Sequence, residues 1–291
     1  MPEPLLISAI VPIAGFPNGT SQIESWLRDS NLSNFEVILV IDSEEEKTHD
    51  ETERIADILR DLATVKVLTS TARNPGGARN LGLSSASGNW VVFWDCDDTP
   101  IPSRFHEMIK QAIQVKADMA IGEYAIQTKL NRLVNSFDGT TAENVLETIA
   151  LNPGIWRFAF KSKLAQKFNF HDMRMAEDQV YLTSILETKP NLFIFKEQVY
   201  TYWRYQNNQL TTSDSALNQI VAALDIFIGK YKRKQCAPLL MVIIRLTLSA
   251  VKKGSTQVKI EAVSRLLYIS LRYPRKLPIL LRLIRRILDS K

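Results

Sequence analysis

Three aspartates stand within four residues directly after a short apolar run. The run covers residues 91–94, and Asp95, Asp97 and Asp98 follow it, with Cys96 between the first two. Carboxylates this close repel one another and raise each other's pKa, and a divalent cation removes that cost. Hard oxygen ligands suit Mg²⁺ or Mn²⁺, which complete their shell with phosphate oxygens and water. The alternative is a solvated turn whose aspartates cap the next helix.

Strand-like and helix-like segments alternate through the first part of the chain and must position this acidic cluster. Runs rich in β-branched and aromatic residues, typical of buried parallel strands, cover residues 5–11, 36–41, 65–68 and 90–94. Segments with apolar residues at helical spacing lie between them, at residues 21–28, 50–62 and 76–85. The alternation predicts a doubly wound, mostly parallel sheet that binds ligands at the carboxyl ends of its strands, after residues 41 and 94.

The middle of the chain mixes strand signals with short helices, whereas the last part is helical. Strand-like runs in the middle cover residues 120–130, 156–160, 192–195 and 199–205. Beyond residue 214, apolar residues recur at helical spacing, at Leu217, Ile220, Val221 and Leu224. We therefore expect the sheet to continue through the middle and an α-helical appendage to follow it.

The acidic cluster resembles the Asp-x-Asp motif of nucleotide-sugar-dependent glycosyltransferases with the GT-A fold, in particular the large inverting family 2. Three further matches follow the family's order between residues 5 and 210. The resemblance implies a Rossmann-like GT-A catalytic domain over residues 1–213, with a nucleotide-binding half at 1–98 and an acceptor-side half at 99–213. Residues 214–291 would be the helical C-terminal region. The implied reaction is metal-dependent transfer of a sugar from a nucleotide diphosphate to an acceptor hydroxyl, with inversion.

Two of the further matches concern the donor. Asp42, at the end of an apolar run, resembles the family's aspartate that binds the nucleotide base. Residues 73–82 resemble its glycine-rich entry into a helix, where a phosphate can approach the backbone amides and Arg79 supplies positive charge; an ordinary turn is the alternative. The resemblance gives Asp97 the role of metal ligand and Asp95 that of a contact to the metal or the ribose.

The acceptor side rests on the third match and on one nearby segment. Glu177 and Asp178 resemble the family's Glu-Asp pair at a helix start, whose aspartate is the catalytic base. A base is needed because the acceptor hydroxyl loses its proton as it attacks the anomeric carbon; acids that only favour the helix dipole are the alternative. Trp156 and Arg157 resemble a segment that lines the acceptor side, where an aromatic face can stack on a sugar ring, although a core tryptophan fits equally well.

The chain departs from the family pattern in several places. Pro12 is not followed by the usual aromatic residue and asparagine, and Asp42 is followed by Ser-Glu-Glu-Glu in place of Gly-Ser. Gln206 stands where many relatives carry a histidine, but Arg204 can still neutralise a diphosphate. The Gln-x-x-Arg-Trp signature of processive, membrane-spanning polymerases is not recognisable, so we expect one sugar to be transferred per encounter.

The composition fits a folded protein and indicates its compartment. Of the 291 residues, 45% are hydrophobic and 23% are charged, which argues against disorder and against a multi-span membrane protein. Cys96 and Cys236 are too few for a disulfide framework, and no amino-terminal segment resembles a signal peptide. We expect a cytoplasmic protein that can work at the inner face of the plasma membrane.

The C-terminal stretch is basic, and its last predicted helix is amphipathic. From Lys252 onward, Lys and Arg far outnumber Asp and Glu. In residues 277–288 apolar and basic side chains take different sides, namely Leu280, Leu281, Ile284 and Leu288 against Arg282, Arg285 and Arg286. Such helices lie in membrane interfaces, and a helix that packs on its own domain is the alternative. We expect peripheral membrane contact here and no nucleic-acid partner.

The expected partners are a nucleotide-sugar donor, with a UDP sugar favoured, and a saccharide or lipid-linked saccharide acceptor in surface polysaccharide or glycolipid synthesis. Two other functions stay open. A nucleotidyltransferase also uses acidic metal ligands on a Rossmann-like sheet, but Gly15 and Gly19, after the first strand, lack the adjacent Lys or Arg that it commonly needs. A non-catalytic nucleotide-sugar-binding subunit would bind the donor and release no nucleotide.

Overall fold

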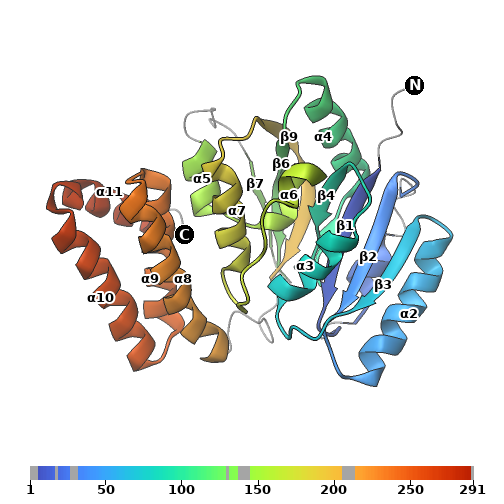
Figure 1. Cartoon of the computed structure of the whole chain (residues 1–291), viewed down its shortest axis with the longest axis horizontal. Helices are drawn as coiled ribbons and strands as arrows, with labels where there is room; N and C mark the ends of the chain where they lie inside the picture. Colours follow the sequence, from blue (N-terminus) through green and yellow to red (C-terminus); the bar gives the residue numbers. More distant parts are fainter. Residues whose placement is uncertain are drawn as a thin grey trace. The chain divides into compact units, whose positions relative to one another are not determined.

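The computed structural model describes residues 6–16, 19–26, 32–128, 131–136, 145–204 and 214–289 (Figure 1). The chain forms two compact units. The first, here called the sheet unit, comprises Met1–Asp138, Gly154–Asp172 and Tyr181–Asn207. The second, the helical unit, comprises Gly139–Pro153, Met173–Val180 and Asn208–Lys291. The helical unit thus contains two short segments from the middle of the chain besides its C-terminal part.

The first half of the sheet unit alternates strands and helices. The strands are β1 (Ile7–Ile13), β2 (Phe35–Ile41), β3 (Thr64–Thr69) and β4 (Trp90–Phe93). The helices are α1 (Ser21–Ser25), α2 (Glu46–Arg60) and α3 (Pro75–Ser85). All pairs among these four strands are parallel, as predicted. β1 and β2 are buried almost throughout because helices cover both of their faces: α2 packs with the odd-numbered residues of β1, and α3 packs on the other side.

The second half of the sheet unit adds antiparallel strands. Its elements are β5 (Thr99–Pro100), α4 (Pro102–Gln114), β6 (Met119–Gln127), β7 (Arg132–Asn135), η2 (Ile155–Arg157), β8 (Phe158–Lys161), α6 (Ser162–Ala165) and β9 (Leu192–Trp203). The sheet order is β3-β2-β1-β4-β8-β6-β9-β5, with β7 on β6. Most of the paired residues lie in parallel pairs, so the predicted mixed, mostly parallel sheet is confirmed.

Two expectations for the middle of the chain need correction. The runs at 192–195 and 199–205 form one strand, β9, because its pairing with β6 shifts register near Gly122 and accommodates the exposed Lys196 and Glu197. A Cβ at Gly122 would lie 2.5 Å from Cγ1 of Val199, so the register shift between β6 and β9 requires glycine at this position. Trp156 lies in the 3₁₀ turn η2 and not in a strand.

The helical unit has its own core. It consists of α5 (Val145–Leu151), α8 (Asp214–Arg233), α9 (Ala237–Lys253), α10 (Thr256–Arg272), η4 (Pro274–Lys276) and α11 (Leu277–Asp289). Helix α7 (Glu177–Glu187) begins in this unit and continues into the sheet unit. α8 and α9 supply more than half of the buried core residues, and α9 contributes a continuous buried run, Leu239–Ile244. Within the described ranges, no helix combines the length and apolarity required to cross a bilayer.

Candidate active site

In the acidic loop after β4 two side chains are buried and two are partly exposed. The backbone N–H of Asp98 donates to the carbonyl of Asp95 (3.2 Å), which closes a turn. Cys96 and Asp98 point inward, with 9% and 1% exposure, whereas Asp95 and Asp97 are partly exposed. Cys96 packs in the hydrophobic core. The turn therefore presents two carboxylates and keeps the third for internal bonding.

Asp98 joins the acidic loop to the end of β9. Its Oδ1 accepts a hydrogen bond from the backbone N–H of Trp203 (2.7 Å). The hydroxyl of Tyr200 accepts from the backbone N–H of Asp95 (3.1 Å), and its interaction with the Asp98 carboxylate favours the ionised form of that group. Burial is the main reason that the pKa of Asp98 lies well above its ordinary value, and the negative charges of Asp97 and Asp95 add to this rise. Sequence reasoning missed Tyr200, which lies about a hundred residues further along the chain in an apolar strand.

Arg79 of α3 lies beside the acidic loop and forms an ion pair with Asp95. Its Nη2 is 2.9 Å from Oδ1 of Asp95, and its side chain is only 6% exposed. The guanidinium also lies over the ring of Phe170, 5.6 Å from its centroid. The structure thus brings together two residues that sequence reasoning assigned to the donor.

The glycines before Arg79 are explained first by packing. Asn74 caps α3 by accepting from the backbone N–H of Gly77 (2.8 Å). A Cβ at Gly76 would lie 2.5 Å from the carbonyl oxygen of His171, and one at Gly77 would lie 2.2 Å from Cβ of Ala72. The role of this turn in phosphate binding stays a prediction.

Asp42 directly follows β2 and is 8% exposed. Its backbone N–H donates to the carbonyl of Ile13 (2.7 Å), and its Oδ1 accepts from the backbone N–H of Arg73 (2.9 Å). Arg73 has a positive φ of 57°, so this contact fixes an unusual backbone geometry just before α3. Asp42 is therefore held between the end of β2 and the start of α3.

The predicted acceptor-side residues of the sheet unit form an aromatic wall. Trp156 stacks on Tyr200 (centroids 4.5 Å apart) and on Tyr202 (5.7 Å), and meets the edge of Tyr124 (4.7 Å). Arg157 is completely buried, with its guanidinium 5.0 Å from the centroid of Tyr124, and burial lowers its pKa to about 10. Arg157 therefore supports the wall from inside. The partly exposed Trp156 packs on the core, and its contact with a sugar stays a prediction.

Arg204 ends the described part of this segment. It is exposed, and its backbone N–H donates to the carbonyl of Gln127 (2.8 Å). Tyr205 and Gln206, which also figured in the sequence prediction, lie outside the described residues.

The predicted catalytic base belongs to the helical unit. Glu177 and Asp178 form the first turn of α7, after Ala176 with a φ of 65°. Glu177 is 6% exposed, and Asp178 is partly exposed. Oδ1 of Asp178 accepts from the backbone N–H of Gln179 (2.7 Å). The side chain of Gln179 accepts in turn from Arg245 of α9, so the first turn of α7 is tied to the core of the helical unit.

The donor set fits a divalent ion that binds together with a nucleotide. In the parts of the chain that the structure describes, no three His, Cys, Asp or Glu side chains converge as a ready-made metal cage. Asp95 and Asp97 are nevertheless two partly exposed carboxylates on one turn. The pKa of Asp97 is raised to about 6, mainly by burial and secondly by the negative charge of Asp95. Mg²⁺ and related ions take one or two carboxylates and leave the other positions to phosphate and water. A dication would offset the repulsion from Asp95, which adds to the effect of burial on this pKa.

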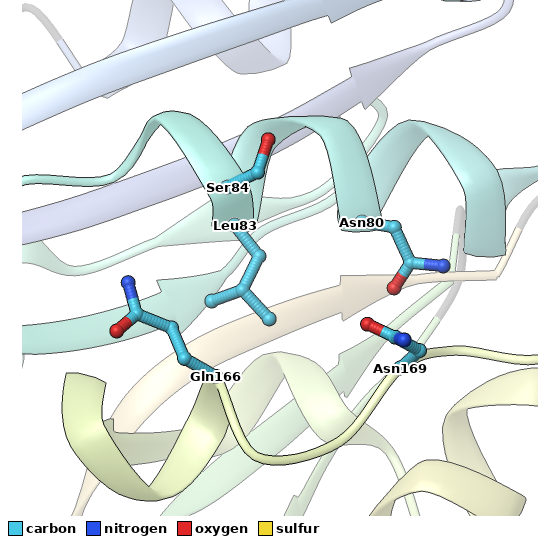
Figure 2. A pocket seen from close by; sticks show the side chains of 5 residues that line it. All are labelled: Asn80, Leu83, Ser84, Gln166 and Asn169. Atoms are coloured by element: carbon cyan, nitrogen blue, oxygen red, sulfur yellow. The ribbon is translucent and has the colours of Figure 1, made fainter.

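A pocket of about 290 Å³ lies elsewhere on the sheet unit. Figure 2 shows it between α3 and the segment after α6, lined by Asn80, Leu83, Ser84, Gln166 and Asn169. The Asn80 amide both donates to and accepts from the backbone of Phe170 (2.9 and 2.8 Å), which is a structural role. None of the predicted site residues lines this pocket.

Comparison with known proteins agrees with the fold. The model of the family described as glycosyl transferase family 2 matches residues 22–178, which is more than half of the chain. An uncharacterized glycosyltransferase of Bacillus subtilis, EpsJ, is 28% identical over 71% of this chain and 63% of its own length. The glucosyltransferase WfgD of Escherichia coli, named for action on α-D-GlcNAc-diphosphoundecaprenol, is 26% identical over 45% of this chain and 50% of its own length. The chain thus spans half to under two thirds of these relatives.

Two solved structures share the fold. Residues 1–349 of TarS from S. aureus, in complex with UDP-GlcNAc, match 98% of this chain and 91% of that chain, with a TM-score of 0.63 and 16% identity. The mannosyltransferase PcManGT from Pyrobaculum calidifontis, in complex with GDP-Man and Mn²⁺, matches 91% of this chain and 75% of that chain, with a TM-score of 0.54 and 17% identity. The chain has the GT-A fold and belongs to glycosyl transferase family 2.

Proposed function

We propose that this chain transfers a sugar from a nucleotide diphosphate sugar, with a UDP sugar favoured, to a hydroxyl of a saccharide or lipid-linked saccharide, with inversion at the anomeric carbon. One observation carries the proposal. The turn after β4 presents Asp95 and Asp97 together, with Arg79 ion-paired to Asp95, in a chain of glycosyl transferase family 2. The bound UDP-GlcNAc of TarS and the diphosphate-linked lipid in the name of WfgD support these substrate classes.

The donor side of the reaction is a problem of charge. The departing nucleotide diphosphate gains negative charge, which needs positive groups nearby. Asp97 and Asp95 would hold Mn²⁺ or Mg²⁺, which supplies Lewis-acid neutralisation of that diphosphate when bound. Arg79, already held beside Asp95, adds a fixed positive charge, and Arg204 adds a second one at the end of β9. Asp42 accepts a hydrogen bond from the nucleotide base.

The acceptor side needs a base and a binding surface. Asp178 takes the proton of the acceptor hydroxyl as the oxygen attacks the anomeric carbon. Glu177 lies next to it in the same helical turn and contributes to acceptor binding. Trp156 offers a partly exposed aromatic surface to a sugar ring, and the buried Arg157 holds that surface in place.

The proposed location follows from the acceptor class. A lipid-linked saccharide of surface polysaccharide or glycolipid synthesis lies in a membrane, and nucleotide sugars are cytoplasmic. We therefore place the reaction in the cytoplasm, at the inner face of the plasma membrane.

The proposal is tested with a panel of UDP, GDP and dTDP sugars. Nucleotide release is measured with Mn²⁺ and with a chelator, and binding is followed by thermal shift. We expect one donor to raise the melting temperature and to release nucleotide in an ion-dependent way. Asp97→Asn should abolish both effects, whereas Glu53→Gln, which changes an exposed acid on α2, should not. A donor that binds without any release would identify a non-catalytic binder, and a panel that shows neither binding nor release would overturn the proposal.

A further inference from the structure

Helix α10 carries apolar residues on two opposite sides. One side, with Val258, Ala262 and Ile269, is buried in the core of the helical unit. The other side is exposed and consists of Ile260 (61% exposed), Val263 (39%), Leu267 (56%) and Leu271 (81%). These four residues, here called the α10 stripe, follow one another at spacings of three or four and so share one face. Folding of the helical unit explains the first side but not the second.

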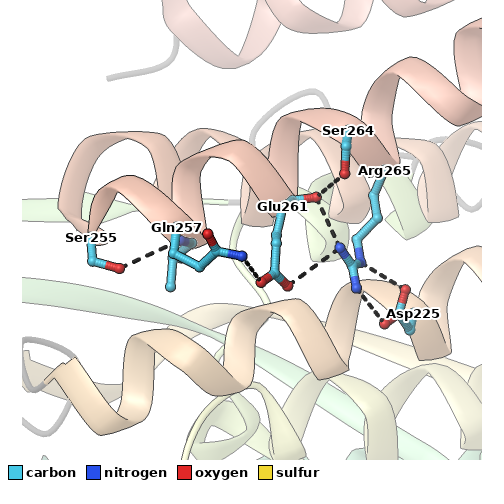
Figure 3. A network of polar contacts seen from close by, with 7 residues as sticks. Asp225, Ser255, Gln257, Glu261, Ser264 and Arg265 are labelled. Carbon is cyan, nitrogen blue, oxygen red and sulfur yellow. Dashed lines mark hydrogen bonds and ion pairs between the residues drawn. The ribbon is translucent and has the colours of Figure 1, made fainter.

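Polar contacts fix the rotation of α10. Arg265 donates from Nε and Nη2 to both carboxylate oxygens of Asp225 on α8, at 2.8 and 3.0 Å. Figure 3 shows this bidentate pair together with Glu261, whose carbonyl accepts from Nη1 of Arg265 (3.1 Å). The side chain of Ser255 caps the helix start. Because these contacts lock the buried side in place, the α10 stripe keeps its outward orientation.

The charge around the stripe indicates what covers it. Residues 252–291 hold eleven Lys and Arg but only two Asp and Glu, so this stretch is strongly positive while the rest of the chain is net negative. Five of the described basic side chains that flank the stripe along the chain are exposed, namely Lys252, Lys253, Lys259, Arg272 and Arg275. A second copy of the chain would bring two such positive regions together, whereas an anionic lipid surface attracts them.

We propose that the α10 stripe docks the chain on an anionic lipid surface, with α10 lying along the interface. At 17 residues the helix is shorter than a bilayer span requires, and apolar side chains bordered by cations are typical of interfacial helices. α10 thus takes the role that the sequence suggested for residues 277–288. Leu280 and Leu283 of α11 are buried in the core of the helical unit, so much of the apolar side of that helix is already used. The docking site deepens the membrane location proposed above and rests on it, but not on the donor chemistry.

The test is sedimentation of the full chain with sucrose-loaded vesicles. One vesicle preparation contains phosphatidylglycerol and the other only phosphatidylcholine. We expect binding to the anionic vesicles that weakens as NaCl is raised, and little binding to the neutral ones. The variant Leu267→Gln/Leu271→Gln should bind the anionic vesicles with an affinity lower by about tenfold or more, because its side chains no longer insert into the apolar part of the interface. Ile113→Gln/Val115→Gln, which removes two exposed apolar residues from the sheet unit, is the matched control and should bind as the parent chain does.

Parent-like vesicle binding by Leu267→Gln/Leu271→Gln would overturn the proposal, as would a parent chain that sediments with neither preparation. Sedimentation equilibrium without vesicles tests the alternative that the stripe mediates self-association. A parent chain that is a dimer, together with a monomeric Leu267→Gln/Leu271→Gln variant, would support self-association instead of lipid binding. Nucleotide release without vesicles reports separately on the proposed transferase activity. It should be equal in the parent and both variants, since none of the altered residues belongs to the proposed active site.

Discussion

Nη2 of Arg245 donates a hydrogen bond to Oε1 of Gln179, the residue that follows the proposed base Asp178. Burial lowers the pKa of Arg245 to about 10, and the negative charge of Asp178 opposes this shift. Arg245 therefore stays protonated at neutral pH beside the first turn of α7. A positive charge in this place favours the ionised form of the carboxylate, which a general base requires.

Replacement of Arg245 should slow turnover without weakening donor binding. For Arg245→Met we expect kcat to fall about tenfold and the acid limb of its pH profile to move to higher pH, because the nearby cation is lost. Arg245→Lys keeps a charge and should recover part of the rate. The measurement is kcat and KM against pH, with the melting temperature of each variant as the control. Equal losses of rate and stability in both variants, with an unchanged pH profile, would reduce Arg245 to a packing residue.

Asp178→Asn should separate chemistry from binding. The amide cannot accept the acceptor's proton at neutral pH, so we expect turnover to fall by a factor of about 10² to 10⁴. Donor affinity, measured by calorimetry, should stay unchanged because Asp178 is not one of the proposed donor-binding groups. Glu187→Gln, at the exposed end of the same helix, is the matched control. Near-parental turnover in Asp178→Asn would show that another group is the base.

The raised pKa of Asp97, about 6, predicts how ion binding depends on pH. A cation must displace the proton that this carboxyl holds below that pKa. The affinity for Mn²⁺ should therefore be constant above pH 7 and fall by up to about tenfold per pH unit well below pH 6. Titration calorimetry with Mn²⁺ and UDP checks this, and Asp97→Ala should lose the ion-dependent part of UDP binding. An affinity that stays flat down to pH 5 would place the ion on other ligands.

The sheet could be predicted from the sequence because its signals are local. The apolar runs that became β1, β2 and β4 are long enough to be recognised without their neighbours, and the spacing of Asp95 and Asp97 is a motif within a few residues. Tyr200 could not be found this way. Its hydroxyl meets the backbone of Asp95 across 105 positions of sequence, and only the pairing of β9 brings them together.

The partner of a charged residue within an apolar helix, and the exposed side of α10, also could not be predicted from the sequence. Arg245 interrupts an apolar run, and the sequence alone does not reveal its partner Gln179, which lies 66 residues earlier. The membrane prediction chose α11 because its apolar and basic sides are cleanly separated in the sequence. α10 has apolar residues on two sides, which blurs a periodic signal, and only tertiary packing shows which side is left exposed.

Tyr200→Phe tests the internal support of the acidic loop. The change removes a hydroxyl that accepts from the backbone N–H of Asp95 and interacts with the carboxylate of Asp98. Because both partners are left in a buried region, we expect the free energy of unfolding to fall by about 1–3 kcal/mol. Urea denaturation measures this, and Tyr268→Phe, the same chemical change at an exposed site of α10, should have little effect. A stability equal to that of the parent would mean that water replaces the hydroxyl at no cost.

Glu36 should make stability depend on pH, because it is 1% exposed in the fully buried strand β2. It accepts hydrogen bonds from Oγ of Ser8 (2.6 Å) and from the backbone N–H and Oγ of Ser87 (2.9 and 2.8 Å), and it forms an ion pair with Lys66. Burial alone would raise the pKa of Glu36, but these partners outweigh burial and lower it from 4.5 to about 2.

Since the folded protein holds this group at the lower pKa, its contribution of about 3 kcal/mol is complete above pH 4.5 and is lost as the pH falls toward 2. Glu36→Gln should therefore unfold at lower urea concentration than the parent at pH 7, and the difference should narrow as the pH is lowered below 4.5. Glu53→Gln, an exposed acid of α2, should follow the parent at every pH. A difference for Glu36→Gln that stays constant from pH 7 to pH 3 would show that the loss comes from packing and not from the ionised carboxylate.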